Sequence, residues 1–302
     1  MKKVLLFAAI AMIFSCKNET KQNGKLNIVT TTTMITDLVK NIGGDYVNLQ
    51  GLMGSGVDPH LYKASEGDFR KLVNADIIFY NGLHLEGKLV DVFEKMEKQG
   101  KKPIALANGL DKTKLIGSEY FASNYDPHVW FDIDFFKTFA NRVTTVLSEN
   151  DPENAENYLQ NQKKYLLELD NLKKDVQGVV DALPRNKRIL VTAHDAFNYF
   201  GEAHDFKVVG LQGLSTATEA GVQDVQKLAA FIIDQKIKAI FVESSVPKRT
   251  IEALQKAVKS KGHDVKIGGT LYSDALGNSG TLEGTYIGMY RYNIKTIVSA
   301  LL

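Results

Sequence analysis

The tripeptide Asp-Pro-His occurs twice in this chain, at Asp58-Pro59-His60 and at Asp126-Pro127-His128, and a hydrophobic or aromatic pair follows each copy. Proline fixes its own backbone angle and moves the preceding residue toward extended structure. The histidine that follows is therefore held at a rigid bend. An imidazole in a fixed position suits metal ligation, so His60 and His128 are candidate metal ligands.

The aspartates of the two motifs have two interpretations. Asp58 and Asp126 can orient their histidines by hydrogen bonding, as carboxylates behind metal-bound imidazoles do. They can equally be turn residues, because Asp before Pro favours the start of a turn. The sequence leaves both interpretations open.

Further polar residues follow strand-like runs elsewhere in the chain. His194 and Glu243 come after the apolar runs 188–192 and 239–242, and Asp274 comes after a run around residues 265–267. In open parallel sheets, ligands bind beyond the carboxyl ends of the strands. We therefore expect a site in the cleft between two lobes, formed by His60, His128, His194 and Asp274.

The chemistry of this set suits a borderline divalent cation. Neutral imidazole favours zinc and its neighbours, while manganese prefers more oxygen, so Zn(II) is the first expectation and Mn(II) the second. Four protein ligands close a tetrahedral shell, which binds an ion but leaves no open position for catalysis. We therefore expect a binding protein and not an enzyme.

Two other functions compete with metal binding and transport. A zinc-dependent hydrolase would fit the ligand types, but the chain has no His-Glu-x-x-His helix and no nucleophile elbow. A metal-independent adhesin or organic-solute receptor would leave the paired Asp-Pro-His motifs unexplained.

The three other histidines have ordinary interpretations. His84 is expected to be a surface or capping residue, and His204 and His263, which stand among charged residues and glycine, are expected to be solvated.

The elements that position these residues repeat along the chain. A shift of 162 residues places Asn27 over Ile189, residues 49–52 over 211–214, and residues 77–80 over 239–242. The short β-branched and apolar runs are typical of strands, and residues 34–42 and 196–203 have helical spacing. This alternation predicts an α/β chain with two lobes, each built on a parallel sheet flanked by helices.

A long helix is expected between the halves. Asp151 is a candidate N-cap, Pro152 suits the first helical position, and residues 153–183 contain no proline before Pro184. Such a helix is about 45 Å long, enough to join both lobes as a rigid backbone. A coiled-coil helix is the alternative, but the apolar positions hold no sustained heptad.

The N-terminus resembles a lipoprotein signal. Lys2-Lys3 precedes an apolar run over residues 4–14, and the only cysteine, Cys16, follows Ser15. The segment Ile13-Phe14-Ser15-Cys16 resembles a lipobox, which implies cleavage before Cys16 and its acylation; an ordinary signal peptide with an incidental cysteine is the alternative. The expected division is signal peptide 1–15, lipid anchor and tether 16–24, N-terminal lobe 25–150, linking helix 151–184 and C-terminal lobe 185–302.

The charge balance excludes one class of partner. Without Lys2 and Lys3, basic and acidic residues are equal in number. A net charge near zero argues against nucleic acid as a partner.

With Cys16 used as the anchor, no thiol remains for a disulfide or a cysteine-based zinc site.

Several short segments together resemble the cluster A-I solute-binding proteins, the zinc- and manganese-binding lipoproteins that supply ABC importers. Besides the Asp-Pro-His motifs, they are Phe-Tyr-Asn-Gly-Leu around Asn81, Thr-Ala-His194-Asp-Ala-Phe, Phe-Val-Glu243-Ser and Tyr-Ser-Asp274-Ala-Leu-Gly. The resemblance implies that His60, His128, His194 and Asp274 bind the metal and that Glu243 lies behind them. It also implies a monomer that is lipid-anchored outside the cytoplasm, periplasmic or at the cell surface, and that works with a membrane permease and its ATPase.

The chain departs from the family pattern in two places. Zinc-uptake members often have a His-rich insertion between the first two metal histidines, but residues 61–127 contain only His84. The family commonly has Glu-Pro-Ser where this chain has Glu219-Ala220-Gly221, so no role is assigned to those residues.

Overall fold

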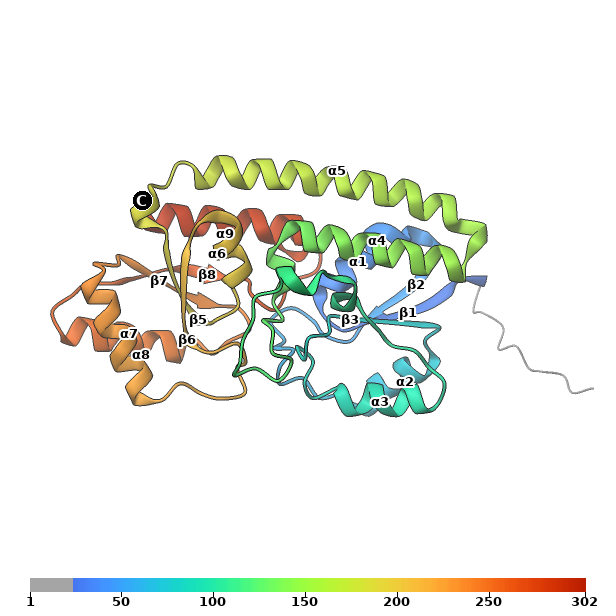
Figure 1. Cartoon of the computed structure of the whole chain (residues 1–302), viewed down its shortest axis with the longest axis horizontal. Coiled ribbons are helices and arrows are strands. Elements are labelled where there is room, and N and C mark those ends of the chain that lie inside the picture. Colours follow the sequence, from blue (N-terminus) through green and yellow to red (C-terminus); the bar gives the residue numbers. More distant parts are fainter. Residues whose placement is uncertain (1–23) are drawn as a thin grey trace, which may run out of the picture.

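The computed structural model describes residues 24–302, which form two α/β lobes side by side along one long helix (Figure 1). The expected signal peptide, Cys16 and residues 17–23 of the expected tether lie outside the described residues. Over residues 24–302, no helix combines the length and the apolar character needed to cross a membrane.

The N-terminal lobe is built on a four-stranded parallel sheet. Its strands, in the spatial order β2-β1-β3-β4, are β1 (Leu26–Thr30), β2 (Val47–Gly51), β3 (Ile77–Tyr80) and β4 (Ile104–Ala105). Successive residues of β1 enter different cores, with Ile28 on one face of the sheet and Val29 on the other. This is the pattern of a strand with both faces covered.

The C-terminal lobe repeats the arrangement. Its strands are β5 (Ile189–His194), β6 (Lys207–Gln212), β7 (Ala239–Glu243) and β8 (Lys266–Leu271). Parallel ladders join β5 to β6 and β7 to β8, and β5 also lies beside β7, although no ladder between those two forms within residues 24–302. The strands that the 162-residue shift aligns therefore occupy equivalent places in the two lobes.

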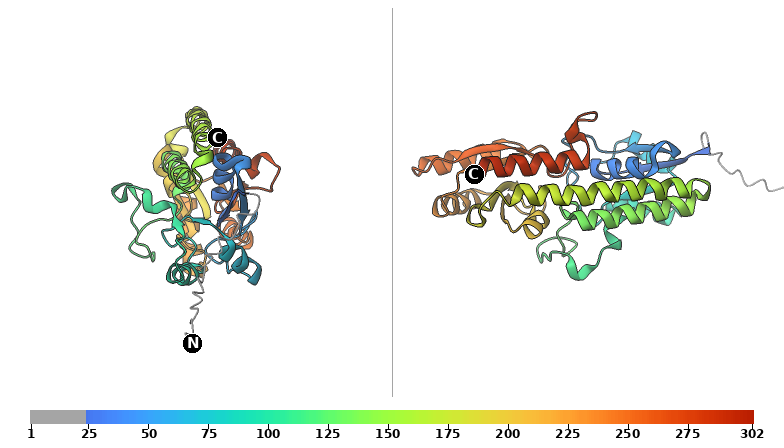
Figure 2. Two further views of the ribbon diagram at one scale, coloured as in Figure 1. Left: turned by 90° about the vertical axis from the view of Figure 1, so that its right-hand side faces the viewer. Right: turned by 90° about the horizontal axis from the view of Figure 1, so that it is seen from above.

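Helices cover both faces of each lobe (Figures 1 and 2). The sheet of the N-terminal lobe has α2 and α3 on one side and α1 and α4 on the other, while α7 and α8 cover one side of the C-terminal lobe. The helices are α1 (Thr33–Gly43), α2 (Glu66–Asn74), α3 (Val90–Lys98), α4 (Ile133–Asn150), α5 (Ala155–Val180), α6 (Asn198–His204), α7 (Val222–Asp234), α8 (Arg249–Ser260) and α9 (Tyr286–Leu301).

The linking helix α5 is shorter than expected. It packs against α1 and α4 of the N-terminal lobe and α9 of the C-terminal lobe, and Figure 2 shows it running along both. Residues 152–154 form a 3-10 turn before it, and the helix ends at Val180. Asp151 and Pro152 occupy the expected N-cap and first positions, although of this 3-10 turn and not of α5 itself. The Asp151 carboxylate accepts side-chain hydrogen bonds from Asn154 and Tyr158 and makes no cap hydrogen bond to a backbone N–H of the turn.

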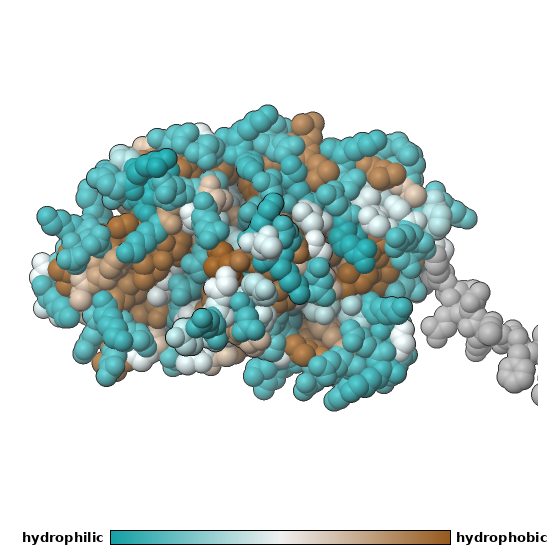
Figure 3. Space-filling model, in the orientation of Figure 1, coloured by the Kyte–Doolittle hydropathy of each residue, from teal (hydrophilic) through white to brown (hydrophobic). Residues whose placement is uncertain are grey.

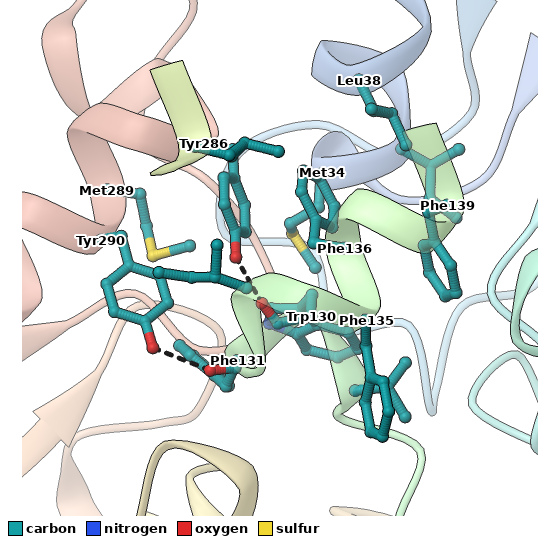
Figure 4. Packing of buried hydrophobic residues seen from close by; sticks show 14 of the residues in the cluster. Met34, Leu38, Trp130, Phe131, Phe135, Phe136, Phe139, Tyr286, Met289 and Tyr290 are labelled. Carbon is teal, nitrogen blue, oxygen red and sulfur yellow. Dashed lines mark hydrogen bonds between the residues drawn. The ribbon is translucent and has the colours of Figure 1, made fainter. Parts of the chain in front are cut away.

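One hydrophobic core runs through both lobes (Figure 4). The ring of Phe136 in α4 stacks on Tyr286 in α9, with 3.8 Å between centroids and 13° between planes. The hydroxyl of Tyr286 donates to the carbonyl of Trp130 at 2.6 Å, and that of Tyr290 donates to the carbonyl of Phe131 at 2.7 Å. The lobes are therefore joined by packing as well as by the chain.

The surface of the molecule contrasts with this core. On the face drawn in Figure 3, which is the face seen in Figure 1, hydrophilic residues dominate.

One buried carboxylate in this junction makes stability depend on pH. Asp37 of α1 accepts a hydrogen bond from the backbone N–H of Tyr286, and burial raises the pKa of Asp37 to about 6. Ionisation of Asp37 is thus harder in the folded than in the unfolded chain. Below the unfolded pKa near 4 the carboxyl is protonated in both states and the free energy of unfolding is unaffected, whereas above pH 6 ionisation lowers the free energy of unfolding by its full amount.

We therefore expect Asp37→Asn, which stays neutral, to raise the free energy of unfolding by up to about 3 kcal/mol at pH 7.5. The gain should shrink toward zero at pH 4. Denaturant unfolding of both proteins at several pH values measures it, with Asp45→Asn at an exposed position as the control. A gain that is constant with pH would contradict the assignment.

Candidate metal centre

Four buried side chains meet where the two lobes face each other. His60, His128, His194 and Asp274 each offer one ligand atom, and these atoms all lie within 4.8 Å of one another. None of the four residues exposes more than 4% of its surface. The two lobes contribute equally, since His60 and His128 belong to the first and His194 and Asp274 to the second.

Each residue stands at or beyond the carboxyl end of a strand, as parallel sheets favour for ligand sites. His60 lies in the connection after β2, and His128 immediately precedes the 3-10 turn 129–131. Asp274 follows β8. One detail differs from expectation: His194 and Glu243 are the last residues of β5 and β7 and do not lie in the loops after them.

The spacing of the donor atoms suits one small cation. His60 Nε2 and His128 Nε2 are 3.3 Å apart, and Asp274 Oδ2 lies 3.2 Å from His194 Nε2. Donors at zinc bond lengths in a tetrahedron are about 3.3 Å apart. Within the part of the chain that the structure describes, Asp274 Oδ1 has no hydrogen-bond partner, and His194 Nε2 has only its ion-pair contact with Asp274 Oδ2. Buried polar atoms without partners point to a missing ligand.

The surroundings shift the pKa values of His60 and His194 in opposite directions. Burial lowers the pKa of His60 to about 3, so this imidazole is neutral and ready to bind a metal. Burial also opposes a charge on His194, but the carboxylates of Asp274 and Glu243 outweigh it and raise its pKa well above the usual value. The pKa of Asp274 is lowered, because the histidines around it overcome the effect of burial.

Two carboxylates hold the rings of His128 and His194 from behind. Asp126 Oδ1 lies 2.7 Å from His128 Nδ1, and Glu243 Oε2 lies 2.6 Å from His194 Nδ1. Glu243 also accepts a hydrogen bond from the backbone N–H of His194 at 2.9 Å. Both contacts leave Nε2 facing the centre, which is the arrangement that fixes a metal-binding imidazole.

Asp58 has a different local role. Its Oδ1 accepts a hydrogen bond from the backbone N–H of His60 at 2.8 Å, and its Oδ2 accepts one from Thr216 Oγ1 at 2.5 Å. No contact joins its carboxylate to the His60 ring within residues 24–302. Asp126 therefore has both of the roles considered from the sequence, because it closes its turn and orients the His128 ring. Of those two roles, Asp58 has only the closing of its turn.

Trp130 contacts both halves of the site, a role that the sequence did not indicate. Its ring meets His128 edge to face at 5.3 Å, and its Nε1 donates to the carbonyl of Ser273, the neighbour of Asp274. Ser245 Oγ lies 3.5 Å from Asp274 Oδ2. Only the position of Trp130 two residues after His128 could have suggested such a contact.

The other histidines lie outside the cluster. His84 is exposed, as expected. The expectation that His204 is solvated is wrong: α6 turns it inward beside Tyr290, and burial lowers its pKa to about 4. His263 is half-buried, with Nε2 2.9 Å from the carbonyl of Ile237.

A bilobal α/β fold with a buried imidazole and carboxylate cluster between its lobes is the architecture of a solute-binding protein. Residues 28–300 match the family described as zinc-uptake complex component A, periplasmic. The chain belongs to this family. The resemblance to metal-binding lipoproteins of ABC importers, drawn from the sequence motifs, is confirmed.

Its relatives match over nearly their whole length. The chain is 46% identical to the manganese-binding lipoprotein MntA of Bacillus subtilis, over 98% of this chain and 97% of that protein. It is 48% identical to the zinc-binding protein TroA of Treponema pallidum, over 92% and 90%. The solved structure of periplasmic zinc-binding TroA superimposes with a TM-score of 0.89, covering 92% of this chain and 99% of that one. The manganese ABC transporter substrate-binding lipoprotein PsaA of Streptococcus pneumoniae (strain ATCC BAA-334 / TIGR4) is 30% identical, over 99% and 97%.

Proposed function

We propose that this protein captures a divalent metal ion outside the cytoplasm and delivers it to the permease of an ABC importer. The observation that carries the proposal is the buried cluster of His60, His128, His194 and Asp274, whose donor atoms have the spacing of a single coordination shell. The names of the relatives, which include metal-binding lipoproteins and ABC transporter substrate-binding proteins, support it.

Zn(II) is the proposed cargo, with Mn(II) as the second candidate. Three imidazole nitrogens and one carboxylate favour zinc over manganese, which prefers more oxygen ligands. The missing His-rich insertion weighs weakly against zinc, and relatives of nearly equal identity are named for zinc and for manganese. The choice of metal therefore rests on the donor set.

Catalysis forms no part of the proposal. A shell of four protein ligands leaves no position for an activated water, in contrast to zinc hydrolases. A metal-independent adhesin or organic-solute receptor gives no account of two buried histidine nitrogens 3.3 Å apart.

The proposed setting is the outer side of a membrane. Acylated Cys16 would be the anchor after removal of residues 1–15, and residues 17–24 would tether the lobes, which we assign to residues 25–150 and 185–302 around the linking segment 151–184. The proposed partners are the permease and its ATPase, and the protein is proposed to act as a monomer.

Metal content and competitive affinity for Zn(II) and Mn(II) test the proposal on the purified protein. We expect one tightly held ion per chain and a loss of affinity of about 100-fold or more in Asp274→Ala, because removing the carboxylate also removes the charge that balances the ion. The metal that binds more tightly identifies the cargo. A chain that holds no stoichiometric metal would contradict the proposal.

A further inference from the structure

The aspartates of the two Asp-Pro-His motifs make the same pair of contacts. One carboxylate oxygen of each, Oδ1, accepts a hydrogen bond from the backbone N–H of the histidine two residues later, at 2.8 Å for Asp58 and 2.9 Å for Asp126. The other oxygen, Oδ2, accepts from a side chain of the opposite lobe. The donors are Thr216 Oγ1, at 2.5 Å from Asp58, and Asn198 Nδ2, at 3.0 Å from Asp126.

Each aspartate therefore links a histidine of the N-terminal lobe to the C-terminal lobe. The proline between aspartate and histidine has a fixed backbone angle, and the hydrogen bond to the histidine N–H closes the turn. The three residues of each motif form one stiff unit. A hydrogen bond on the aspartate is consequently a constraint on the position of the histidine.

The donors are themselves tied to the second half of the site. Asn198 begins α6, and its Nδ2 also lies 3.3 Å from the carbonyl of Asp195, the residue after His194. The hydroxyl of the neighbouring Tyr199 donates to the carbonyl of Asp126 at 3.0 Å, which fixes the same turn a second time. Asn198 thus connects the histidine turn of one lobe to the strand end that carries the histidine of the other.

Each of these contacts has one buried partner, which limits the access of water. Asp126 is fully buried and Thr216 exposes only 8% of its surface, whereas Asn198 and Asp58 are half-buried. Hydrogen bonds to a buried carboxylate are stronger than those between neutral groups. Asp58 also has no contact with the His60 ring within the described residues, so its bond to Thr216 is not explained by orientation of that imidazole.

We propose that Thr216 and Asn198 are positioning residues that hold the two Asp-Pro-His turns against the C-terminal lobe and thereby slow the release of the bound metal. The inference rests on the proposed function, since it concerns the same four ligands. Neither residue offers an atom to the ion. Each acts through an aspartate on a histidine.

Removal of either donor should accelerate metal release and leave the ligand set intact. We expect Thr216→Val and Asn198→Ala to retain one metal ion per chain but to release Zn(II) to an excess of a chromophoric chelator about ten-fold faster, the loss expected for one hydrogen bond to a charged group. Thr216→Ser, which keeps the hydroxyl, should restore the slow rate. The visible spectrum of the Co(II)-loaded protein should change in the two variants, because the distance between the lobes alters the coordination geometry.

Matched controls separate this role from a loss of stability. Thr144→Val removes an equally buried hydroxyl that bonds within α4, and Asn161→Ala removes a half-buried amide that bonds α5 to α1. Both should lower the melting temperature of the metal-free protein without changing release. Release at the wild-type rate from Thr216→Val and Asn198→Ala would overturn the inference alone. A wild-type protein without stoichiometric metal would overturn the proposed function and the inference together.

Discussion

Replacement of His194 by alanine is expected to lower the affinity for Zn(II) by about 100-fold or more. His194 is fully buried, it contributes one of the four converging donor atoms, and its Nε2 lies 3.2 Å from Asp274 Oδ2. The substitution also removes the imidazole between Glu243 and Asp274, so two buried carboxylates are left close together without the positive partner that balances them.

Competition with a chelating dye measures this loss, and circular dichroism on the same samples shows that the variant is folded. His263→Ala is the matched control, because His263 is a half-buried histidine whose Nε2 lies near a backbone carbonyl outside the cluster. We expect its affinity to equal that of the wild type. Equal losses in the two variants would remove His194 from the ligand set.

Replacement of Tyr286 by alanine is expected to cost about 3–5 kcal/mol of unfolding free energy. The ring is fully buried at the junction of the lobes and stacks on Phe136, and its hydroxyl satisfies the carbonyl of Trp130. Tyr286→Phe keeps the ring and removes only the hydrogen bond, so it should cost about 1–2 kcal/mol.

Denaturant unfolding of the metal-free proteins measures both changes. Tyr292→Ala, on the same helix but only half-buried, is the comparison and should cost less than Tyr286→Ala. If the alanine and phenylalanine variants at position 286 lost the same free energy, the contribution would lie in the hydroxyl and not in the packing between the lobes.

The sequence predicted the features that local patterns encode. The period of the apolar residues located the paired strands, and the repeated Asp-Pro-His tripeptide indicated His60 and His128 without further information. The complete ligand set also needed the resemblance to a known family, because nothing in the spacing of His194 and Asp274 requires them to meet the first two.

The prediction that failed depended on tertiary contacts. His204 stands among polar neighbours in the sequence, yet it is the last residue of a short helix whose inner side faces the core. The bonds from Thr216 and Asn198 join residues 158 and 72 positions apart, a separation at which no local pattern operates.

The hydrophobic core shared by the two lobes has a consequence for cooperativity. Domains with separate cores unfold in separate steps, whereas elements of one continuous core lose their packing together. Since α4, α5 and α9 contribute to the same core from both sides of the junction, the protein should melt in one transition instead of two. An ion bound between the lobes then stabilises the whole chain, so the position of that single transition reports whether the carrier is loaded.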